Sequence, residues 1–424
     1  MVDKEGLDYY EVGGAPRDRI MGREPNDYDY VVVGASREEM IQRGFLRIES
    51  ADFPIFLDKD SADEGEMGDE YALARTEQKE GDGEGYTSFD WCVENVNLKE
   101  DLRRRDFTIN AMARDPETGE IIDPFGGKED IERGVIRHVS EAFSDDPLRI
   151  IRMARFASRF DFDVSEETME LAQGISDEIE AVDNTRLIRE FIKAMKQAEK
   201  PSKFFRLCEE AGVFEHFLPV VDEMTKIPAG PPKYHKEGTV FEHSLMVTDE
   251  LHKLRGNRPM ELLGAFFHDV GKVRTYDEES PYEHYGHAKE GVKVIDDIDE
   301  KIGLRKDLYR YLTAACREHM KIKRLSRMNN NKIIPLLNKY YQNEGSANIE
   351  FIVELGLADS RGRIPQGDFE HGKAIDIVEK GKIAVDMING DYLQERHDDF
   401  LNWEGEKRGQ VVKSHYVEEL AKLR

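Results

Sequence analysis

Hydrophobic and polar residues alternate over short runs in the first part of the chain and follow a helical period in the rest. The short runs are rich in aromatic and β-branched residues, which is typical of strands. They predict strands over residues 9–12, 30–33, 45–48, 53–57 and 71–75. Short helices are predicted around Arg17 and over residues 36–42, where Ser36 can serve as N-cap. The pattern therefore predicts an α+β protein, in which a small mixed sheet with helices on one side precedes a mainly α-helical part.

Polar segments and changes of pattern divide the chain further. Residues 58–70 are acidic, which predicts a loop or hairpin excursion, and residues 77–85 have no apolar side chain, which predicts a mobile loop. The proline-rich residues 224–234 are predicted to form a linker. The resulting parts are a head over 1–137, a neck over 138–200, a helical body and linker over 201–237, a further helical domain over 238–362 and a helical tail over 363–424, with helices at 368–382 and 391–400.

The composition indicates a soluble protein of a reducing compartment. No apolar run is long enough to span a membrane, and the first residues do not resemble a signal peptide, so we expect a cytoplasmic protein. Cys92, Cys208 and Cys316 are too scattered for a disulfide framework. The net charge of −27 argues against a general nucleic-acid coat protein, because phosphate contacts need clustered Lys and Arg. It still allows an enzyme with one local basic surface.

The first candidate site combines a glycine pair with two carboxylates. Gly13 and Gly14 lie between the first strand and the helix of Arg17, where backbone can approach a phosphate closely. Asp27 and Asp29 are two residues apart at the start of the next strand and so point to one side. Mg²⁺ prefers such carboxylates together with substrate phosphates. Either motif alone also fits a turn with solvated aspartates, but together they favour metal-dependent nucleotide chemistry.

A run of arginines supplies the second candidate. Arg105 precedes Asp106 and a buried-looking apolar segment. Its planar guanidinium can bind a phosphate or a ribose. The alternative is a surface ion-pair cluster of little energetic weight. The apolar residues that follow favour the functional role.

A third candidate lies where a long helix begins. Asp146, Arg149, Arg152 and Arg155 follow one another at steps of three, with Pro147 suited to a first helical turn. Such steps make a spiralling stripe and not a single face. A carboxylate and a guanidinium can match the edge of a nucleobase, because one accepts and the other donates hydrogen bonds. The alternative is an amphipathic helix with a basic flank.

Histidines and aspartates mark a fourth candidate in the domain over 238–362. His268 and Asp269 are adjacent in an apolar helix predicted over residues 262–270, where burial is costly unless they are paired or ligate a metal. The other members are His243, His287, His319 and Asp359. Imidazole and carboxylate ligands suit Mn, Fe, Co, Ni or Zn better than Mg. Isolated histidines usually belong to a core, but this order favours a metal site.

Three motifs in this order resemble those of a known family. GGAPRDRIMG with DYDYVVVGAS looks like the glycine and carboxylate motif of the bacterial-type (class II) tRNA nucleotidyltransferases, or CCA-adding enzymes. RRRDFTINAMA is similar to their ribose motif, and DDPLRIIRMARFASRF to their neck-helix nucleobase motif. The likeness extends to the subgroup with an HD phosphohydrolase domain. It implies a polymerase β-like nucleotidyltransferase head followed by an α-helical neck, body and HD domain.

The resemblance also implies residue roles. Asp27 and Asp29 would hold a catalytic Mg²⁺, and Gly14 and Arg17 would contact the triphosphate. Arg105 and Asp106 would select the ribose, and Asp146 and Arg149 would pair with the base edge of ATP or CTP. Arg152 and Arg155 would complete the base and phosphate contacts. Phosphohydrolase chemistry would use His268, Asp269 and His319, with His243, His287 and Asp359 as further candidates, and a transition metal such as Ni, Mn or Co.

The implied activity is the addition of CCA to the 3′ end of tRNA from CTP and ATP, without a nucleic-acid template and with release of pyrophosphate. An additional 2′,3′-cyclic phosphodiesterase or phosphatase activity would serve tRNA repair. The expected partners are tRNA, ATP and CTP, with no membrane, and the protein would be a monomer or homodimer. We also expect a basic groove from the neck arginines and residues 321–327. The alternatives are a poly(A) polymerase, an enzyme adding only CC or A, an HD phosphohydrolase with an RNA-binding head, and an inactive tRNA-binding protein.

Overall fold

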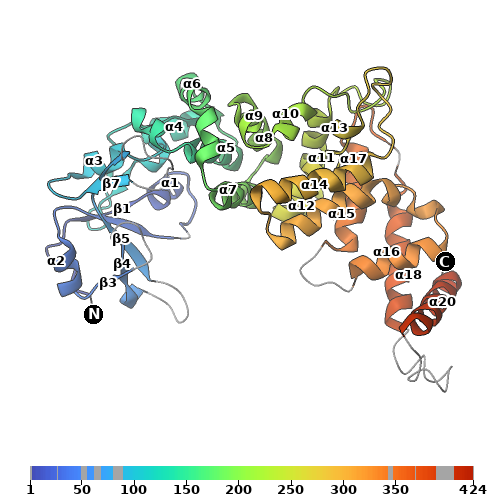
Figure 1. Cartoon of the computed structure of the whole chain (residues 1–424). Coiled ribbons are helices and arrows are strands. Elements are labelled where there is room, and N and C mark those ends of the chain that lie inside the picture. Colours follow the sequence, from blue (N-terminus) through green and yellow to red (C-terminus); the bar gives the residue numbers. More distant parts are fainter. Residues whose placement is uncertain are drawn as a thin grey trace. The chain divides into compact units, whose positions relative to one another are not determined.

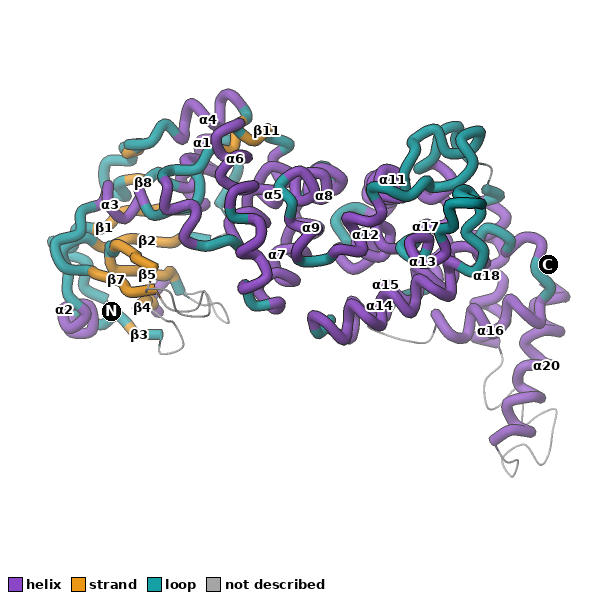
Figure 2. The backbone as a smooth tube through the Cα atoms, turned by 45° about the horizontal axis from the view of Figure 1, so that its top comes forward, coloured by secondary structure: helices purple, strands orange, loops and turns teal. Residues whose placement is uncertain are grey.

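A computed structural model describes most of the chain. The described residues are 2–25, 27–48, 55–61, 68–79, 89–341, 347–367, 369–387 and 405–423. They form two compact units, the first comprising Met1–Glu190 and Arg206–Phe217 and the second Phe191–Phe205 and Leu218–Arg424. The described strands belong to the first unit, and helices make up the second (Figure 2). No helix of the described residues is long and apolar enough to cross a membrane.

The main sheet of the first unit is mixed, as predicted. Its order is β3-β4-β5-β2-β1-β8-β9. The strands are β1 (Tyr9–Val12), β2 (Asp29–Val32), β3 (Leu46–Arg47), β4 (Ile55–Asp58), β5 (Asp69–Leu73), β8 (Ala113–Arg114) and β9 (Ile121–Ile122). β2 and β5 are parallel, and the other neighbours are antiparallel. The single parallel pair places the start of β5 beside the start of β2.

Apolar side chains pack on both faces of this sheet. Successive residues of a strand point to opposite faces, and accordingly Val31 joins one buried cluster and Val32 the other. Leu102 of α3 (Leu98–Arg103) packs in the first cluster and Met40 of α2 (Arg37–Gln42) in the second. The expectation of helices on one side only is therefore wrong, because the face of Val32 is apolar enough to need a helix of its own.

Two predicted loops are partly strands. Residues 77–79 belong to β6 (Thr76–Lys79), which pairs antiparallel with β7 (Phe89–Cys92), so the loop predicted over 77–85 is wrong at its start. In the acidic segment 58–70, β4 ends at Asp58 and β5 begins at Asp69. Residues 62–67 and 80–88, the centres of the two predictions, lie outside the described residues. β6 consists of polar residues and so has no hydrophobic period to detect, whereas β7 is only four residues long.

The rest of the first unit is helical apart from a short pair, β10 (Val135–Ile136) and β11 (Asp163–Val164). Its further helices are α1 (Gly14–Ile20), α4 (Gly127–Arg133), α5 (Leu148–Phe160), α6 (Glu166–Gly174) and α9 (Val213–His216), and α7 (Asn184–Gln197) and α8 (Pro201–Glu210) contain the boundaries between the units. α5 is largely buried, because apolar residues surround its arginines on several sides. The nucleobase motif thus lies on a core helix.

The second unit packs its helices around α15 (Lys306–Ile322). Its contacts include α12 (Pro259–Phe267), α14 (His287–Ile302) and α17 (Ile349–Arg361), and α11 (Val240–Arg255) packs on α12 and α17 (Figure 1). The remaining described helices are α10 (Pro219–Met224), α13 (Lys272–Thr275), α16 (Asn330–Tyr341), α18 (His371–Met387) and α20 (Gly405–Leu423). α12 ends at Phe267, earlier than predicted. The helix predicted over 391–400 lies outside the described residues.

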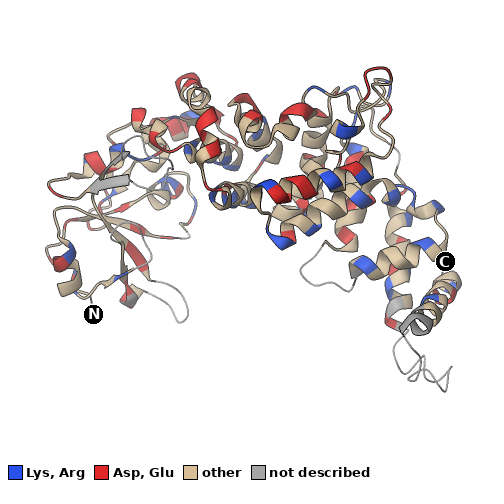
Figure 3. Ribbon diagram, in the orientation of Figure 1, with Lys and Arg blue, Asp and Glu red and all other residues tan. Residues whose placement is uncertain are grey.

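Acidic side chains are distributed over the helices of both units, with Lys and Arg among them (Figure 3). Many form pairs one helical turn apart, such as Arg133 with Glu129 and Lys226 with Asp222. Exposed pairs of this kind contribute little to stability. The acidic balance of the chain is thus mostly a property of solvated helix faces.

Phe56 offers a test of the sheet core. Phe56 belongs to β4, and its side chain is fully buried in the cluster that contains Tyr71. We expect Phe56→Ala to lower the free energy of unfolding by about 3–5 kcal/mol, because it removes a large buried side chain and leaves a cavity. Leu46→Ala, at a residue that is 39% exposed, should cost less than about 1 kcal/mol. Urea-induced unfolding measures both, and equal effects would contradict the packing described.

Candidate nucleotide site and candidate metal centre

The glycine pair, Asp29 and Arg105 come together in the first unit. Gly13 precedes α1 with φ +75°, a conformation that favours glycine. A Cβ at Gly13 would lie 3.5 Å from Oδ2 of Asp29 and 3.6 Å from Nη1 of Arg105. Burial raises the pKa of Asp29, the nearby Arg105 lowers it, and Asp27 raises it further. The predicted carboxylates and Arg105 therefore share one small region beside the glycine turn.

A further carboxylate, Glu70, belongs to the same region. In the parallel pairing of β2 and β5, Asp29 lies opposite Glu70. Burial and the charges of Asp29 and Asp27 raise the pKa of Glu70. Like-charged carboxylates at close range are relieved by a cation between them. Sequence reasoning missed Glu70, because the residue looks like the end of an acidic loop and nothing local reveals the register between two strands.

Arg17 lies inside the head and not on its surface. Its Nε donates to Oδ1 of Asp18 at 2.9 Å and its Nη1 to Oδ1 of Asn110 at 2.5 Å. Its guanidinium also lies over the ring of Phe160. A Cβ at Gly14 would come within 3.2 Å of Nη2 of Arg17, so the small residue leaves room for the guanidinium. The predicted contact of Gly14 and Arg17 with a triphosphate stays a prediction.

The arginine run is tied to buried carboxylates. Nη2 of Arg105 donates to Asp101 at 3.0 Å, while its Nε is buried without a hydrogen-bond partner among the described residues. Asp106 accepts from Nε of Arg152 at 2.9 Å and from Asn110 at 3.1 Å. Although burial favours protonation, Arg152 and Asn110 lower the pKa of Asp106 to about 2. Arg152 and Asp106, predicted for base and ribose, thus bind each other here.

Asp146 and Arg149 are held at the start of α5. Oδ1 of Asp146 accepts from the backbone N–H of Leu148 at 3.0 Å, and Oδ2 accepts from Arg186 at 2.9 Å. Arg149 donates to the carbonyl of Arg104 at 2.8 Å. Arg186 belongs to α7. The contact shows that α7 fixes the orientation of Asp146.

Arg155 forms a buried ion pair. Its Nε lies 2.6 Å from Oε2 of Glu190, and the two side chains are only 6% and 5% exposed. Its guanidinium also lies over the ring of Phe156. These contacts support a structural role, and a contact of Arg155 with nucleotide remains a prediction.

We expect Glu190→Ala to destabilise the first unit by about 3–5 kcal/mol, because it removes the carboxylate that offsets the buried charge of Arg155. Glu129→Ala removes one member of an exposed pair with Arg133 and should cost less than about 1 kcal/mol. Chemical unfolding of the two variants provides the measurement. A loss at Glu190 as small as that at Glu129 would rule out the structural role of the pair.

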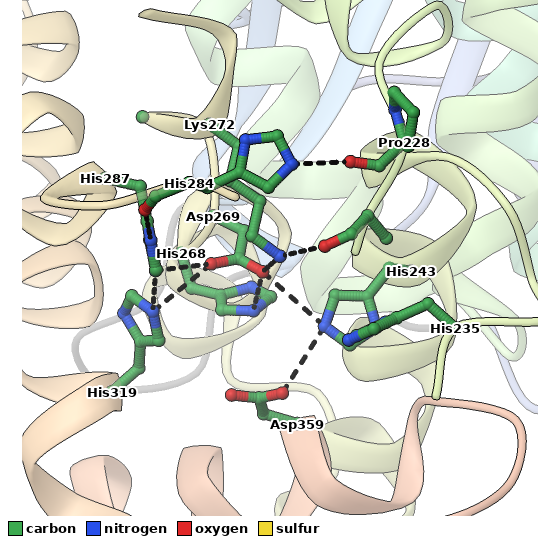
Figure 4. A network of polar contacts seen from close by, with 12 residues as sticks. Pro228, His235, His243, His268, Asp269, Lys272, His284, His287, His319 and Asp359 are labelled. Carbon is green, nitrogen blue, oxygen red and sulfur yellow. Dashed lines mark hydrogen bonds and ion pairs between the residues drawn. The ribbon is translucent and has the colours of Figure 1, made fainter. Parts of the chain in front are cut away.

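The predicted histidines and aspartates of the second unit form one buried cluster (Figure 4). They come from five segments of chain: His243 from α11, His268 and Asp269 from the turn after α12, His287 from the start of α14, His319 from α15 and Asp359 from α17. The apolar helix α12 ends at Phe267, directly before this turn, so its packing in the core places His268 and Asp269 at the cluster.

Asp269 lies at the centre of the cluster. Its Oδ2 is 3.3 Å from Nε2 of His268 and 3.6 Å from Nε2 of His243. Its Oδ1 is 3.2 Å from Nε2 of His319 and 3.4 Å from Nε2 of His287. The two oxygens therefore face two groups of imidazoles, and both groups have a spacing that could hold a metal ion.

The Nδ1 atoms of these histidines all face backbone carbonyls. The acceptors are Gly362 O for His243 at 3.0 Å, Ala265 O for His268 at 2.7 Å, His284 O for His287 at 2.6 Å and Ala315 O for His319 at 3.0 Å. We assign the ring proton to Nδ1 on this basis. Each Nε2 then presents a lone pair to the cluster, as metal-ligating histidines do.

Lone pairs that face carboxylate oxygens repel one another unless a cation lies between them. Nε2 of His243 and of His268 and Oδ1 of Asp269 are buried without a hydrogen-bond partner in the described part of the chain. Unpaired buried groups are costly. Burial also lowers the pKa of His287 to about 4, so this imidazole is neutral, as ligation requires. The residues thus fit a transition metal with nitrogen and oxygen ligands.

Sequence reasoning missed the charged neighbours of the cluster. Lys272 lies 2.7 Å from Oδ2 of Asp269, and Lys323 forms an ion pair with Asp359. Despite burial, Lys272 and His268 hold the pKa of Asp269 well below its usual range. Lys272 could have been noticed from its spacing, since residues 269 and 272 lie one turn apart, whereas Lys323 comes from another helix.

Family models match three segments of the chain. A poly(A) polymerase head domain matches residues 9–137, a probable RNA- and SrmB-binding site of polymerase A matches 161–225, and an HD domain matches 240–346. The sheet and the carboxylates of the head lie within the first of these segments, and His243, His268, Asp269, His287 and His319 lie within the last, whereas Asp359 follows it. The chain is accordingly a nucleotidyltransferase that carries an HD domain.

Relatives over nearly the full length define the family further. The multifunctional CCA protein of Stenotrophomonas maltophilia is 35% identical to this chain, and the aligned region covers 89% of this chain and 92% of that protein. The protein of the same name from Alkalilimnicola ehrlichii is 34% identical, and the aligned region covers 98% of this chain and 97% of that protein. The chain belongs to the family of multifunctional CCA proteins, which confirms the resemblance seen in the sequence.

Solved structures share the fold. A CCA-adding enzyme in complex with ATP has a TM-score of 0.62 at 23% identity and covers 99% of this chain and 87% of that one. The Thermotoga maritima CCA-adding enzyme complexed with tRNA has a TM-score of 0.61 at 23% identity and covers 99% and 92%. The predicted mixed-sheet head with a mainly α-helical remainder is confirmed.

Proposed function

We propose that this chain adds CCA to the 3′ end of tRNA from CTP and ATP, without a nucleic-acid template. The observation that carries the proposal is the group of Asp27, Asp29 and Glu70 beside Gly13 and Arg105, in a chain whose full-length relatives are CCA proteins. Solved enzymes of this fold have been described with ATP, with CTP and with tRNA. The naming of the relatives favours CCA addition over a poly(A) polymerase.

The terminal 3′ hydroxyl of the RNA attacks the α-phosphate of the nucleotide and forms a new P–O bond. The bond between the α-phosphorus and the oxygen that bridges to the β-phosphate breaks, and pyrophosphate leaves. Asp27 and Asp29, with Glu70 beside them, would hold Mg²⁺, which supplies charge neutralisation and lowers the pKa of the hydroxyl. Arg105, which lies near Gly13 and Asp29, would offset phosphate charge. Preorganised cations of this kind stabilise the developing charge of the transition state.

Base recognition would use the residues at the start of α5. Asp146 offers a carboxylate that α7 holds through Arg186, and Arg149 offers a guanidinium held by carbonyls. An incoming base or ribose would form hydrogen bonds with Arg152 or Asp106 that replace those between these two side chains. The choice between C and A then depends on small rearrangements here. We place Asp146, Arg149 and Arg152 in a neck over 138–200, and Asp106 and the metal-binding carboxylates in a head over 1–137.

We expect Asp29→Ala to reduce incorporation of CMP and AMP into tRNA lacking its CCA end by about a thousandfold or more, because metal-assisted charge stabilisation amounts to several kcal/mol. The variant should unfold like wild type. Glu117→Ala, at an exposed residue of the same unit, is the matched control and should keep full activity.

Labelled CTP and ATP, supplied singly and together, complete this assay. Normal incorporation by Asp29→Ala would overturn the metal assignment. Use of ATP alone, with no CMP added by wild type, would instead favour an A-adding enzyme or a poly(A) polymerase.

The second unit supports a metal-dependent phosphohydrolase, for which 2′,3′-cyclic phosphates at RNA ends are the proposed substrate. His243, His268, Asp269 and Asp359 would hold one ion, and His287 and His319 share the other oxygen of Asp269. Ni, Mn or Co fits these ligands, and such an ion would supply Lewis acidity and activate water. Lys272 and Lys323 hold the two carboxylates and add positive charge for a phosphate.

We expect Asp269→Asn to abolish hydrolysis of a 2′,3′-cyclic phosphate and to leave CMP and AMP incorporation within about twofold of wild type, because the two sites use different residues. Asp29→Ala should show the reverse pattern. Chelation followed by addition of Ni²⁺, Mn²⁺ or Co²⁺ identifies the ion that restores hydrolysis. Full hydrolysis by Asp269→Asn would sink the assignment of the cluster.

A further inference from the structure

We propose that Glu237 is a positioning residue of the HD metal centre, which orients His243 and strengthens its bond to the metal. The inference rests on the proposed metal centre and adds to it a carboxylate that does not contact the ion. Glu237 lies in the turn before α11, and its side chain is 2% exposed. A carboxylate buried this completely needs partners for both oxygens.

The two oxygens of Glu237 join three segments of chain. Oε1 lies 3.2 Å from Nδ1 of His243 and 2.7 Å from Nδ1 of His235. Oε2 accepts from the backbone N–H of Ile364 at 2.9 Å. Glu237 therefore accepts hydrogen bonds through both oxygens at the back of the cluster.

Among the described histidines of the cluster, His243 differs from the others in this carboxylate neighbour. The Nδ1 atoms of His268, His287 and His319 face backbone carbonyls. Nδ1 of His243 faces the carbonyl of Gly362 and Glu237 together. An anion that accepts from Nδ1–H makes Nε2 a stronger donor to a metal.

Glu237 also fixes the segment that follows α17. Ile364 lies two residues beyond Gly362, and α17 carries Asp359 three residues before Gly362. A Cβ at Gly362 would come within 2.6 Å of Val247 of α11, so the end of α17 packs tightly on the helix of His243. One carboxylate thereby helps to set two ligands, His243 and Asp359, that come from different helices.

Glu237 is not itself a ligand of the same ion. Its Oε1 lies at Nδ1 of His243, whereas Nε2, at the other end of the ring, faces Asp269 and Asp359. The spacing of His235, Glu237 and His243 could in principle hold a separate ion. Nδ1 of His243 carries the ring proton, however, which faces both Gly362 O and Oε1 of Glu237, and a protonated nitrogen has no lone pair for a metal.

The test is the binding of Co²⁺ to the full-length protein, followed by visible absorption and with excess Mg²⁺ to saturate the carboxylates of the head. We expect Glu237→Gln to weaken Co²⁺ binding by roughly 10- to 100-fold, the range typical for outer-shell partners of a ligating histidine. The absorption bands of the bound Co²⁺ should also shift in this variant, because His243 becomes a weaker ligand.

Glu354→Gln is the matched control. Glu354 accepts from His371 at 3.2 Å, a histidine outside the metal cluster, so this variant also removes a carboxylate from a histidine of the second unit. Its affinity for Co²⁺ should stay within about twofold of wild type. Equal affinities for wild type, Glu237→Gln and Glu354→Gln would overturn the positioning role and leave the metal centre intact.

Glu237→Asp keeps the charge but is one methylene shorter, and it serves if Glu237→Gln does not fold. We expect about tenfold weaker Co²⁺ binding, and wild-type affinity with an unshifted spectrum would overturn the proposal. If the wild-type protein showed no visible absorption of Co²⁺ bound to histidine ligands, the metal centre itself would be refuted. That outcome differs from one in which Co²⁺ binds with an affinity that does not depend on Glu237.

Discussion

The burial of carboxylates governs both units of this protein. A carboxylate that leaves water needs positive charge or hydrogen-bond donors close by, and these come from residues far apart in sequence. In the first unit, Asp101, Asp106 and Glu190 are each matched by arginines. In the second, Asp269 collects imidazoles and Lys272 from several helices. Each such carboxylate fixes the relative position of its segments more narrowly than apolar packing alone would.

Local patterns in the sequence were enough to select candidate residues that the structure brings together. The glycine turn, the spacing of Asp27 and Asp29, and the order of histidines and aspartates depend on neighbours in the chain, and residues one or two apart have a fixed geometry on a strand or turn. The mixed sheet and the helical remainder were likewise predicted from the spacing of hydrophobic residues along the chain. Glu70, Glu237 and Lys323 were missed, because register and tertiary contact decide their partners.

The arginines and lysines show where reasoning from charge alone misleads. A basic groove was expected from the neck arginines and residues 321–327. In the structure, Arg152 binds Asp106 and Arg155 binds Glu190, while Lys321 and Lys323 bind Glu318 and Asp359. Much of that positive charge is thus used inside the protein. A run of cations in a sequence does not reveal whether its partners are phosphates or carboxylates of the same chain.

The lysines beside the metal cluster change what a metal ion has to contribute to this domain. The ammonium groups of Lys272 and Lys323 supply positive charge to Asp269 and Asp359 from within the chain. Part of the charge that balances these buried carboxylates is thus covalently attached to the protein, in contrast to small zinc domains, whose folding depends on the metal. A metal ion bound here would share its carboxylates with two ammonium groups, so the lysines would weaken its hold on the site relative to a cluster with neutral neighbours.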